Sequence, residues 1–175
     1  MKKSSEKQCY YENYPLSFLL VSNLFQIAIY VIGAIILYHL GIFFLILYLI
    51  YVLFLEFRVM KKSCINCYYY GKYCSFGKGK IASVLFKKGN KDFAKKEISW
   101  KDILPDFLVS IIPILIGIIL LTIQLSWLIL ISIVMLLVLT FAGNALVRGN
   151  LACKFCKQRK LGCPAERLFN KGKNH

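Results

Sequence analysis

Two long stretches of the chain contain no charged side chain. No Asp, Glu, Lys or Arg occurs from Asn13 to Leu55, and none occurs from Phe107 to Val147. Each stretch has about 40 residues, and at about 1.5 Å per residue one helix of that length would be roughly twice as long as the ~30 Å hydrocarbon core is thick. Each stretch is therefore predicted to cross a membrane twice, as a helical hairpin.

Small and polar residues mark the turn of each predicted hairpin. In the first stretch His39, Leu40 and Gly41 supply a glycine and an ionisable group where the backbone must reverse. In the second, residues 124–127 fill that place and end on a tryptophan suited to an interfacial aromatic belt. The predicted fold is an all-α membrane protein with four transmembrane helices. These helices are expected over residues 15–38, 41–57, 104–123 and 126–147.

The basic residues predict the orientation of the helices. The chain has 23 Lys and Arg against 8 Asp and Glu, a formal net charge of +15. Every Lys and Arg lies before the first hairpin, between the hairpins or after the second, and neither hairpin turn carries one. By the positive-inside rule, both termini and the middle loop are expected in the cytoplasm, with the protein in the cell membrane. These cations are expected to attract anionic lipid head groups and, because they flank membrane spans, not to bind nucleic acid.

This organisation divides the chain into five segments. A first apolar stretch of this length is too long for a cleaved signal peptide, so its helix is expected to remain. The segments are a cytoplasmic N-terminal segment (1–14), a first hairpin (15–57), a basic cysteine-containing loop (58–103), a second hairpin (104–147) and a basic cysteine-containing tail (148–175).

A cysteine motif occurs once behind each hairpin. CINCYYYGKYC and CKFCKQRKLGC both have the spacing C-x2-C-x6-C. Their cysteines are Cys64, Cys67 and Cys74 in the first motif and Cys153, Cys156 and Cys163 in the second. The motifs lie at nearly the same distance behind Pro15 and Pro105, which suit the first turn of a helix. The halves are therefore predicted to be parallel repeats, related by a pseudo-twofold axis along the membrane normal.

The paired cysteine motifs predict a metal site on the cytoplasmic side. The cytosol keeps thiols reduced, which disfavours disulfides, whereas two C-x2-C turns can supply four thiolates to zinc or to an iron–sulfur cluster. Zinc is the expected cofactor and an iron–sulfur cluster the alternative. The first choice for a shared site is Cys64, Cys67, Cys153 and Cys156. Cys74 and Cys163 either join it as a two-metal cluster or complete separate three-sulfur sites.

Other uses of the cysteines stay open at this point. A reactive dithiol, palmitoylation and inert juxtamembrane cysteines are the alternatives to coordination. Separate three-sulfur sites lack an evident fourth ligand, because His39 is expected on the opposite face and His175 is the last residue. Cys9 precedes the first helix and belongs to neither motif.

The predicted metal site is expected to serve a structural or partner-docking purpose at the cytoplasmic face. No catalytic constellation, proton relay or ion filter is visible. The alternatives are a membrane electron-transfer component that uses iron–sulfur clusters or dithiols, and a soft-metal transporter. The transporter ranks last, because Met135 is the only methionine deep in a predicted span. Asn23, Gln26 and Asn144 are expected to bond neighbouring helices. The lysine-rich residues after Cys74 are expected to form an interfacial amphipathic segment.

Overall fold

The computed structural model describes residues 10–90, 93–95, 99–123 and 125–164. Its long helices are α1 (Leu16–Tyr38), α2 (Ile42–Lys62), α4 (Trp100–Ile123) and α5 (Trp127–Val138), and α5 continues through the π-helical segments η3 (Leu139–Gly143) and η4 (Ala145–Cys153). The short elements are η1 (Cys64–Asn66), α3 (Lys78–Leu85), η2 (Phe93–Lys95) and α6 (Lys157–Gly162). No strand occurs among the described residues. The all-helical fold class is confirmed.

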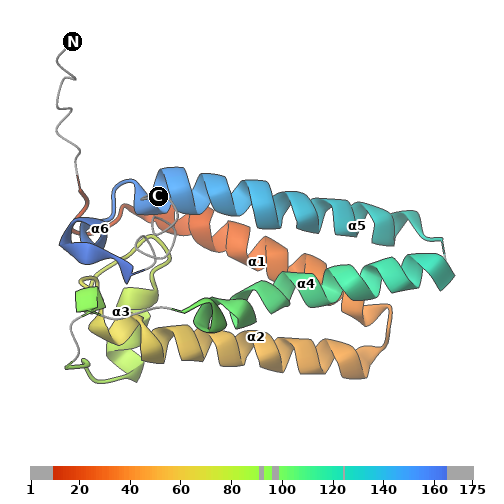
Figure 1. Ribbon diagram of the computed structural model, residues 1–175, viewed down its shortest axis with the longest axis horizontal. Helices are drawn as coiled ribbons and strands as arrows, with labels where there is room; N and C mark the ends of the chain where they lie inside the picture. The colour runs from red at the N-terminus through yellow and green to blue at the C-terminus, as the bar shows by residue number, and fades with distance from the viewer. Residues whose placement is uncertain (1–9, 91–92, 96–98, 124, 165–175) are drawn as a thin grey trace, which may run out of the picture.

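The four long helices lie side by side as two hairpins (Figure 1). α1 and α4 pack against each other at the centre, and both begin at the same end of the bundle. α2 packs on α1 and α4, and α5 packs on α4 and α1. The first turn lies where the sequence predicts it, with Gly41 at a φ of +134° that an L side chain rarely adopts. Position 124 of the second predicted turn lies outside the described residues.

Three helix boundaries differ from the prediction. α2 runs past residue 57 to Lys62, and its last turn carries lysines, which favour a helix C-terminus. α4 begins at Trp100, where the N–H of Ser99 donates to the Asp102 carboxylate at 3.4 Å and the N–H of Asp102 donates to the backbone carbonyl of Ser99 at 2.9 Å. Pro105 therefore lies inside α4 rather than opening it. The last helical path continues beyond residue 147 and ends at Cys153.

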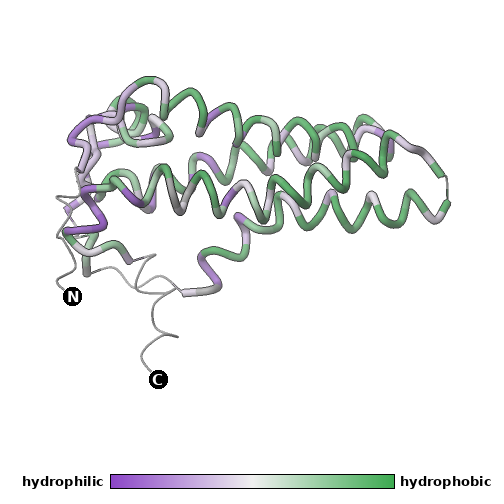
Figure 2. Tube along the Cα trace, turned by 90° about the horizontal axis from the view of Figure 1, so that it is seen from above, coloured by the Kyte–Doolittle hydropathy of each residue, from purple (hydrophilic) through white to green (hydrophobic). Residues whose placement is uncertain are grey.

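The long helices are apolar on nearly all sides, and most of that surface faces outward. In the most apolar 18-residue stretch of each long helix, only 17–22% of the residues are buried in the protein. Leu24 is 71% exposed and Ile119 57% exposed. Figure 2 shows the hydrophobic positions along the bundle and the hydrophilic ones gathered at one end. Lipid is the solvent that such a surface requires, and the four helices are long enough to cross it, which indicates a multi-pass membrane protein.

The interior of the bundle consists of two clusters and close glycine contacts. One cluster joins α1 to α5, and the other joins α1, α2 and α4. A Cβ on Gly117 would lie 2.8 Å from the Ile133 side chain and 3.3 Å from that of Ile36, so a larger residue would require these side chains to shift. Small residues at such contacts are typical of helices that associate in membranes. The clusters are Ile29, Ile36, Ile129, Ile133 and Leu136, and Leu37, Tyr48, Val52, Leu55 and Val109.

Candidate functional site: the cysteine head

Both cysteine motifs lie at the hydrophilic end of the bundle (Figures 1 and 2). We call this region the head, and it consists of the described parts of residues 10–15, 63–95 and 153–164. The head brings together three segments that are far apart in the sequence. It is therefore the place where the two predicted cysteine sets can meet.

The two C-x2-C segments fold into the same kind of turn. The N–H of Cys67 donates to the carbonyl of Cys64 at 3.3 Å, and the N–H of Cys156 donates to the carbonyl of Cys153 at 3.4 Å. The carbonyl of the second cysteine then accepts from the N–H three residues later in both motifs, at 3.0 and 3.1 Å. Cys67 and Cys156 have nearly identical φ angles of −77° and −78°. The two turns thus share their hydrogen bonds and the φ of the second cysteine, whereas its ψ differs, at 153° for Cys67 and 119° for Cys156.

Backbone N–H groups point at the sulfur of the second cysteine in each motif. The Cys67 thiol accepts a bond from Tyr69, and the Cys156 thiol accepts bonds from Gln158 and Arg159. Burial nevertheless raises the pKa of Cys67 to about 12 and raises the pKa of Cys156 as well. Thiols in such surroundings stay protonated at neutral pH and are poor nucleophiles, so these two do not resemble a reactive dithiol.

The two cysteine turns contact each other through the residues that follow Cys67 and Cys156. The N–H of Tyr68 donates to the side-chain oxygen of Gln158 at 2.8 Å. The N–H of Lys157 donates to the hydroxyl of Tyr69 at 3.0 Å. The contact is reciprocal, because each half contributes one backbone donor and one side-chain acceptor. The two thiols also lie within electrostatic reach, since negative charge on Cys156 would raise the pKa of Cys67.

Buried tyrosines join the N-terminal segment to both cysteine turns. Tyr14 is 4% exposed and Tyr69 2% exposed, with ring centroids 5.6 Å apart. Tyr14 donates its hydroxyl to the carbonyl of Ala152 at 2.5 Å, and Tyr69 donates to the carbonyl of Tyr11 at 2.6 Å. The N–H of Tyr11 in turn donates to the carbonyl of Phe155 at 3.2 Å. These tyrosines were not predicted to belong to the site, although tyrosines are dense in the sequence before Pro15 and after Cys67.

Tyr14 marks the space between the two cysteine sets. Burial raises the pKa of its hydroxyl, and negative charge on Cys156 would raise that pKa further. Charge on Cys153 and on Cys74 would act in the same direction. Cys74 belongs to one motif and the other two cysteines to the second, so charge on either motif would act on the Tyr14 hydroxyl.

The six described thiols do not form a complete metal site in this structure. Within the described part of the chain, no three His, Cys, Asp or Glu side chains lie close enough together to hold an ion. Cys153 is exposed at the end of η4, and the other five described cysteines are half-buried. His39 lies at the turn of the first hairpin, away from the head. Cys9 and His175 lie outside the described residues.

The segment after Cys74 is anchored to the membrane helices by polar contacts. Ser75 shares a 2.9 Å hydrogen bond with Ser22 of α1, and both are buried. Lys78, the first residue of α3, forms a 2.7 Å ion pair with Glu56 of α2. Asn23 donates to the carbonyl of the residue that follows Ser75, at 3.4 Å. Asn23 therefore bonds this head segment, and not a neighbouring long helix as predicted.

Comparisons of the chain with protein-family models, curated proteins and solved structures give no match. The head itself has two distinctive features, the repeated cysteine turn and the reciprocal contact between its two copies.

Proposed function

We propose that this protein is a multi-pass protein of the cell membrane whose cytoplasmic head binds a metal ion through its paired cysteine motifs. The metal would fix the loops that leave the membrane, so that the head offers a stable docking surface to a protein partner. The reciprocal contact between the residues that follow Cys67 and Cys156 carries this proposal, because it lays two alike cysteine turns against each other.

The donor set suits zinc. Two C-x2-C turns supply four thiolates, which is a common ligand set for a tetrahedral structural site with bonds of ~2.3 Å. The N–H groups aimed at Cys67 and Cys156 provide the hydrogen bonds that tune sulfur ligands around a metal. Binding requires the thiols to turn toward one another, because no three of the described ones lie close enough together to hold an ion. A structural zinc contributes on the order of 10 kcal/mol to folding, enough to drive that closure.

The proposal treats the two hairpins as parallel repeats. Two observations support this. α1 and α4 begin at the same end of the bundle, and the second helix of each hairpin, α2 or α5, packs on both of these central helices. The two hairpins differ mainly in where their prolines lie, because Pro15 precedes α1 whereas Pro105 lies inside α4. A metal shared across the pseudo-twofold axis would tie the end of α2 to the end of η4. That closure lies at the end of the bundle where lipid does not hold the helices together.

Metal analysis of cysteine variants tests the proposal. The protein is purified anaerobically in detergent, and zinc and iron are measured per chain for the wild type, Cys67→Ser and Cys156→Ser. A shared site predicts about one zinc in the wild type and equal, near-complete loss in both variants, since each removes one of four ligands. Cys9→Ser is the matched control, because this seventh cysteine belongs to neither motif. It should keep the metal.

The other outcomes of the same experiment are distinct. A brown protein that contains iron and loses its colour in both variants would identify an iron–sulfur cluster on the same ligands. Two zinc ions, with each variant losing only one, would indicate separate sites. Wild-type protein that binds no metal, even after reconstitution under reducing conditions, would refute the proposal. Soft-metal transport gains no support from Met135, which is 50% exposed on the outside of the bundle.

A further inference from the structure

A groove follows the outer face of α2 beside the end of α3. Its volume is about 520 Å³, within the range of small-molecule sites. Its lining consists of three aromatic and three cationic side chains and contains no cysteine. The lining residues are Phe54, Phe57 and Phe86, and Arg58, Lys61 and Lys62.

The lining changes from apolar to cationic along α2. Phe54 and Phe57 are 61% and 48% exposed, on the part of α2 that belongs to the apolar span. One turn later Lys61 and Lys62 follow, in the last turn of the helix. The groove therefore offers an apolar wall on the membrane side and positive charge where the helix leaves the membrane. A phospholipid has the matching arrangement, with its acyl chains inside the membrane and its phosphate at the membrane surface.

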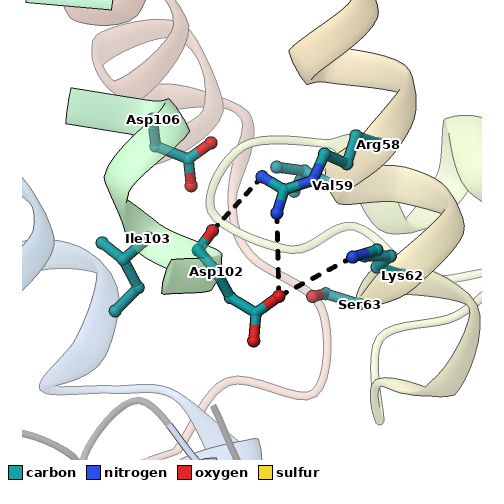
Figure 3. Close-up of a pocket in the computed structure, with 7 residues that line it drawn as sticks. All are labelled: Arg58, Val59, Lys62, Ser63, Asp102, Ile103 and Asp106. Carbon is teal, nitrogen blue, oxygen red and sulfur yellow. Dashed lines mark hydrogen bonds and ion pairs between the residues drawn. The ribbon is translucent and has the colours of Figure 1, made fainter. Parts of the chain in front are cut away.

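Two of the three cations are held in place from the other side of α2. Figure 3 shows Arg58 and Lys62 pointing toward Asp102 of α4. The Arg58 guanidinium lies 3.6 Å from the Asp102 carboxylate and also donates to the backbone carbonyl of Asp102 at 3.2 Å. The Lys62 ammonium lies 3.7 Å from the same carboxylate. Lys61 is exposed and forms no ion pair with any described residue. It is thus the cation that remains for an anionic ligand, beside two others whose positions are fixed.

The α3 side of the groove is also fixed. Tyr70 donates its hydroxyl to the carbonyl of Phe86 at 2.8 Å, which holds the end of α3 on the first cysteine turn. The exposed side chains of α3 include Val84, at 79%, and Leu85, at 51%. An exposed apolar face next to lysines is typical of an element that lies in the head-group region of a bilayer. The groove is therefore expected to open onto lipid.

We propose that this groove binds one anionic glycerophospholipid, with its phosphate at Lys61 and an acyl chain along Phe54 and Phe57. A free anion would use only the cationic half and would leave the phenylalanines without a role. A zwitterionic lipid such as phosphatidylcholine would gain less from the cationic half, because its choline offsets the charge of its phosphate. None of the groove residues is a ligand of the metal proposed for the head.

Lipid binding by purified protein tests this site. Delipidated protein in detergent is titrated with dioleoyl phosphatidylglycerol or dioleoyl phosphatidylcholine, and bound lipid is counted by native mass spectrometry. The wild type should retain one phosphatidylglycerol more tightly than phosphatidylcholine. Lys61→Gln should weaken phosphatidylglycerol binding about fivefold, the equivalent of ~1 kcal/mol per basic residue at a membrane surface. Lys61→Ala serves as a second variant should Lys61→Gln fold poorly.

Lys101→Gln is the matched control, because Lys101 is also exposed, lies at the same end of the bundle and loses the same charge. It should leave phosphatidylglycerol binding unchanged. Phe57→Ala should weaken the binding of both lipids, since it removes part of the apolar wall. Equal effects of Lys61→Gln and Lys101→Gln would reduce the site to general surface charge and overturn the proposal. Equal affinity for the two lipids, or displacement of phosphatidylglycerol by millimolar inorganic phosphate, would overturn it as well.

Discussion

Tyr69→Phe should loosen the contact between the two cysteine turns. The Tyr69 hydroxyl accepts from the N–H of Lys157 and donates to the carbonyl of Tyr11, so it bonds both other segments of the head. The substitution removes one oxygen and keeps the ring, which packs on Tyr14 and on Tyr68. The aromatic packing is therefore preserved, and only the two hydrogen bonds are lost.

The size of the effect follows from the two groups left without a partner. Each unpaired donor or acceptor costs about 1–3 kcal/mol when it is fully buried. Lys157 and Tyr11 are half-buried, which places each loss near the lower limit. The local opening free energy should fall by about 2 kcal/mol, equivalent to roughly 30-fold faster exchange of the Lys157 amide.

Hydrogen–deuterium exchange of the protein in lipid nanodiscs measures this opening. The peptide that contains Lys157 should exchange faster in Tyr69→Phe, while peptides from the centres of α1 and α4 stay unchanged. Tyr73→Phe is the matched control, because Tyr73 lies in the same loop, is 44% exposed and makes no hydroxyl bond to a described residue. Unchanged protection at Lys157 in Tyr69→Phe would show that this hydroxyl does not join the two cysteine turns.

Three further predictions concern other parts of the molecule. Gly79→Ala should destabilise the head by about 1–3 kcal/mol in thermal unfolding, because its Cβ would overlap the backbone carbonyl oxygen of Tyr69 and lie 2.8 Å from that of Lys72; Gly149→Ala, which meets nothing within 4 Å, should not. In metal-free protein at pH 7, Cys67 should react with maleimide far more slowly than after denaturation. Its pKa of about 12 leaves ~10³-fold less thiolate than an ordinary thiol has, and the difference should shrink as pH rises toward 12. A reporter fused after His175 should read as cytoplasmic and one at Gly41 as external, and the reverse result would contradict the proposed orientation.

The sequence predicted the membrane-spanning part well because its determinants are one-dimensional. A hydrocarbon layer requires helices of a minimum apolar length, so the charge-free stretches were enough to place four helices. The first turn followed from Gly41 in the same way. The boundaries toward the head were less accurate, because lysines at the end of α2 and the hydrogen bonds between Ser99 and Asp102 extend the helices beyond their apolar cores.

The packing order of the helices could not be predicted from the pattern. Each span is apolar on nearly all sides, so no polar face indicates which neighbour it contacts. The central position of α1 and α4 depends on close approaches such as that at Gly117, which are set by shape in three dimensions.

The candidate site divides in the same manner. Sequence alone identified six cysteines in two motifs, and both motifs form turns with hydrogen bonds three residues apart. Only the tertiary structure placed Tyr14 and Tyr69 between the two turns and brought the residues after Cys67 and Cys156 into contact. The two hydrogen bonds of the reciprocal contact join residues that are 90 and 88 positions apart in the sequence. Local spacing determines a turn, whereas the meeting of two turns depends on how the helices that carry them pack.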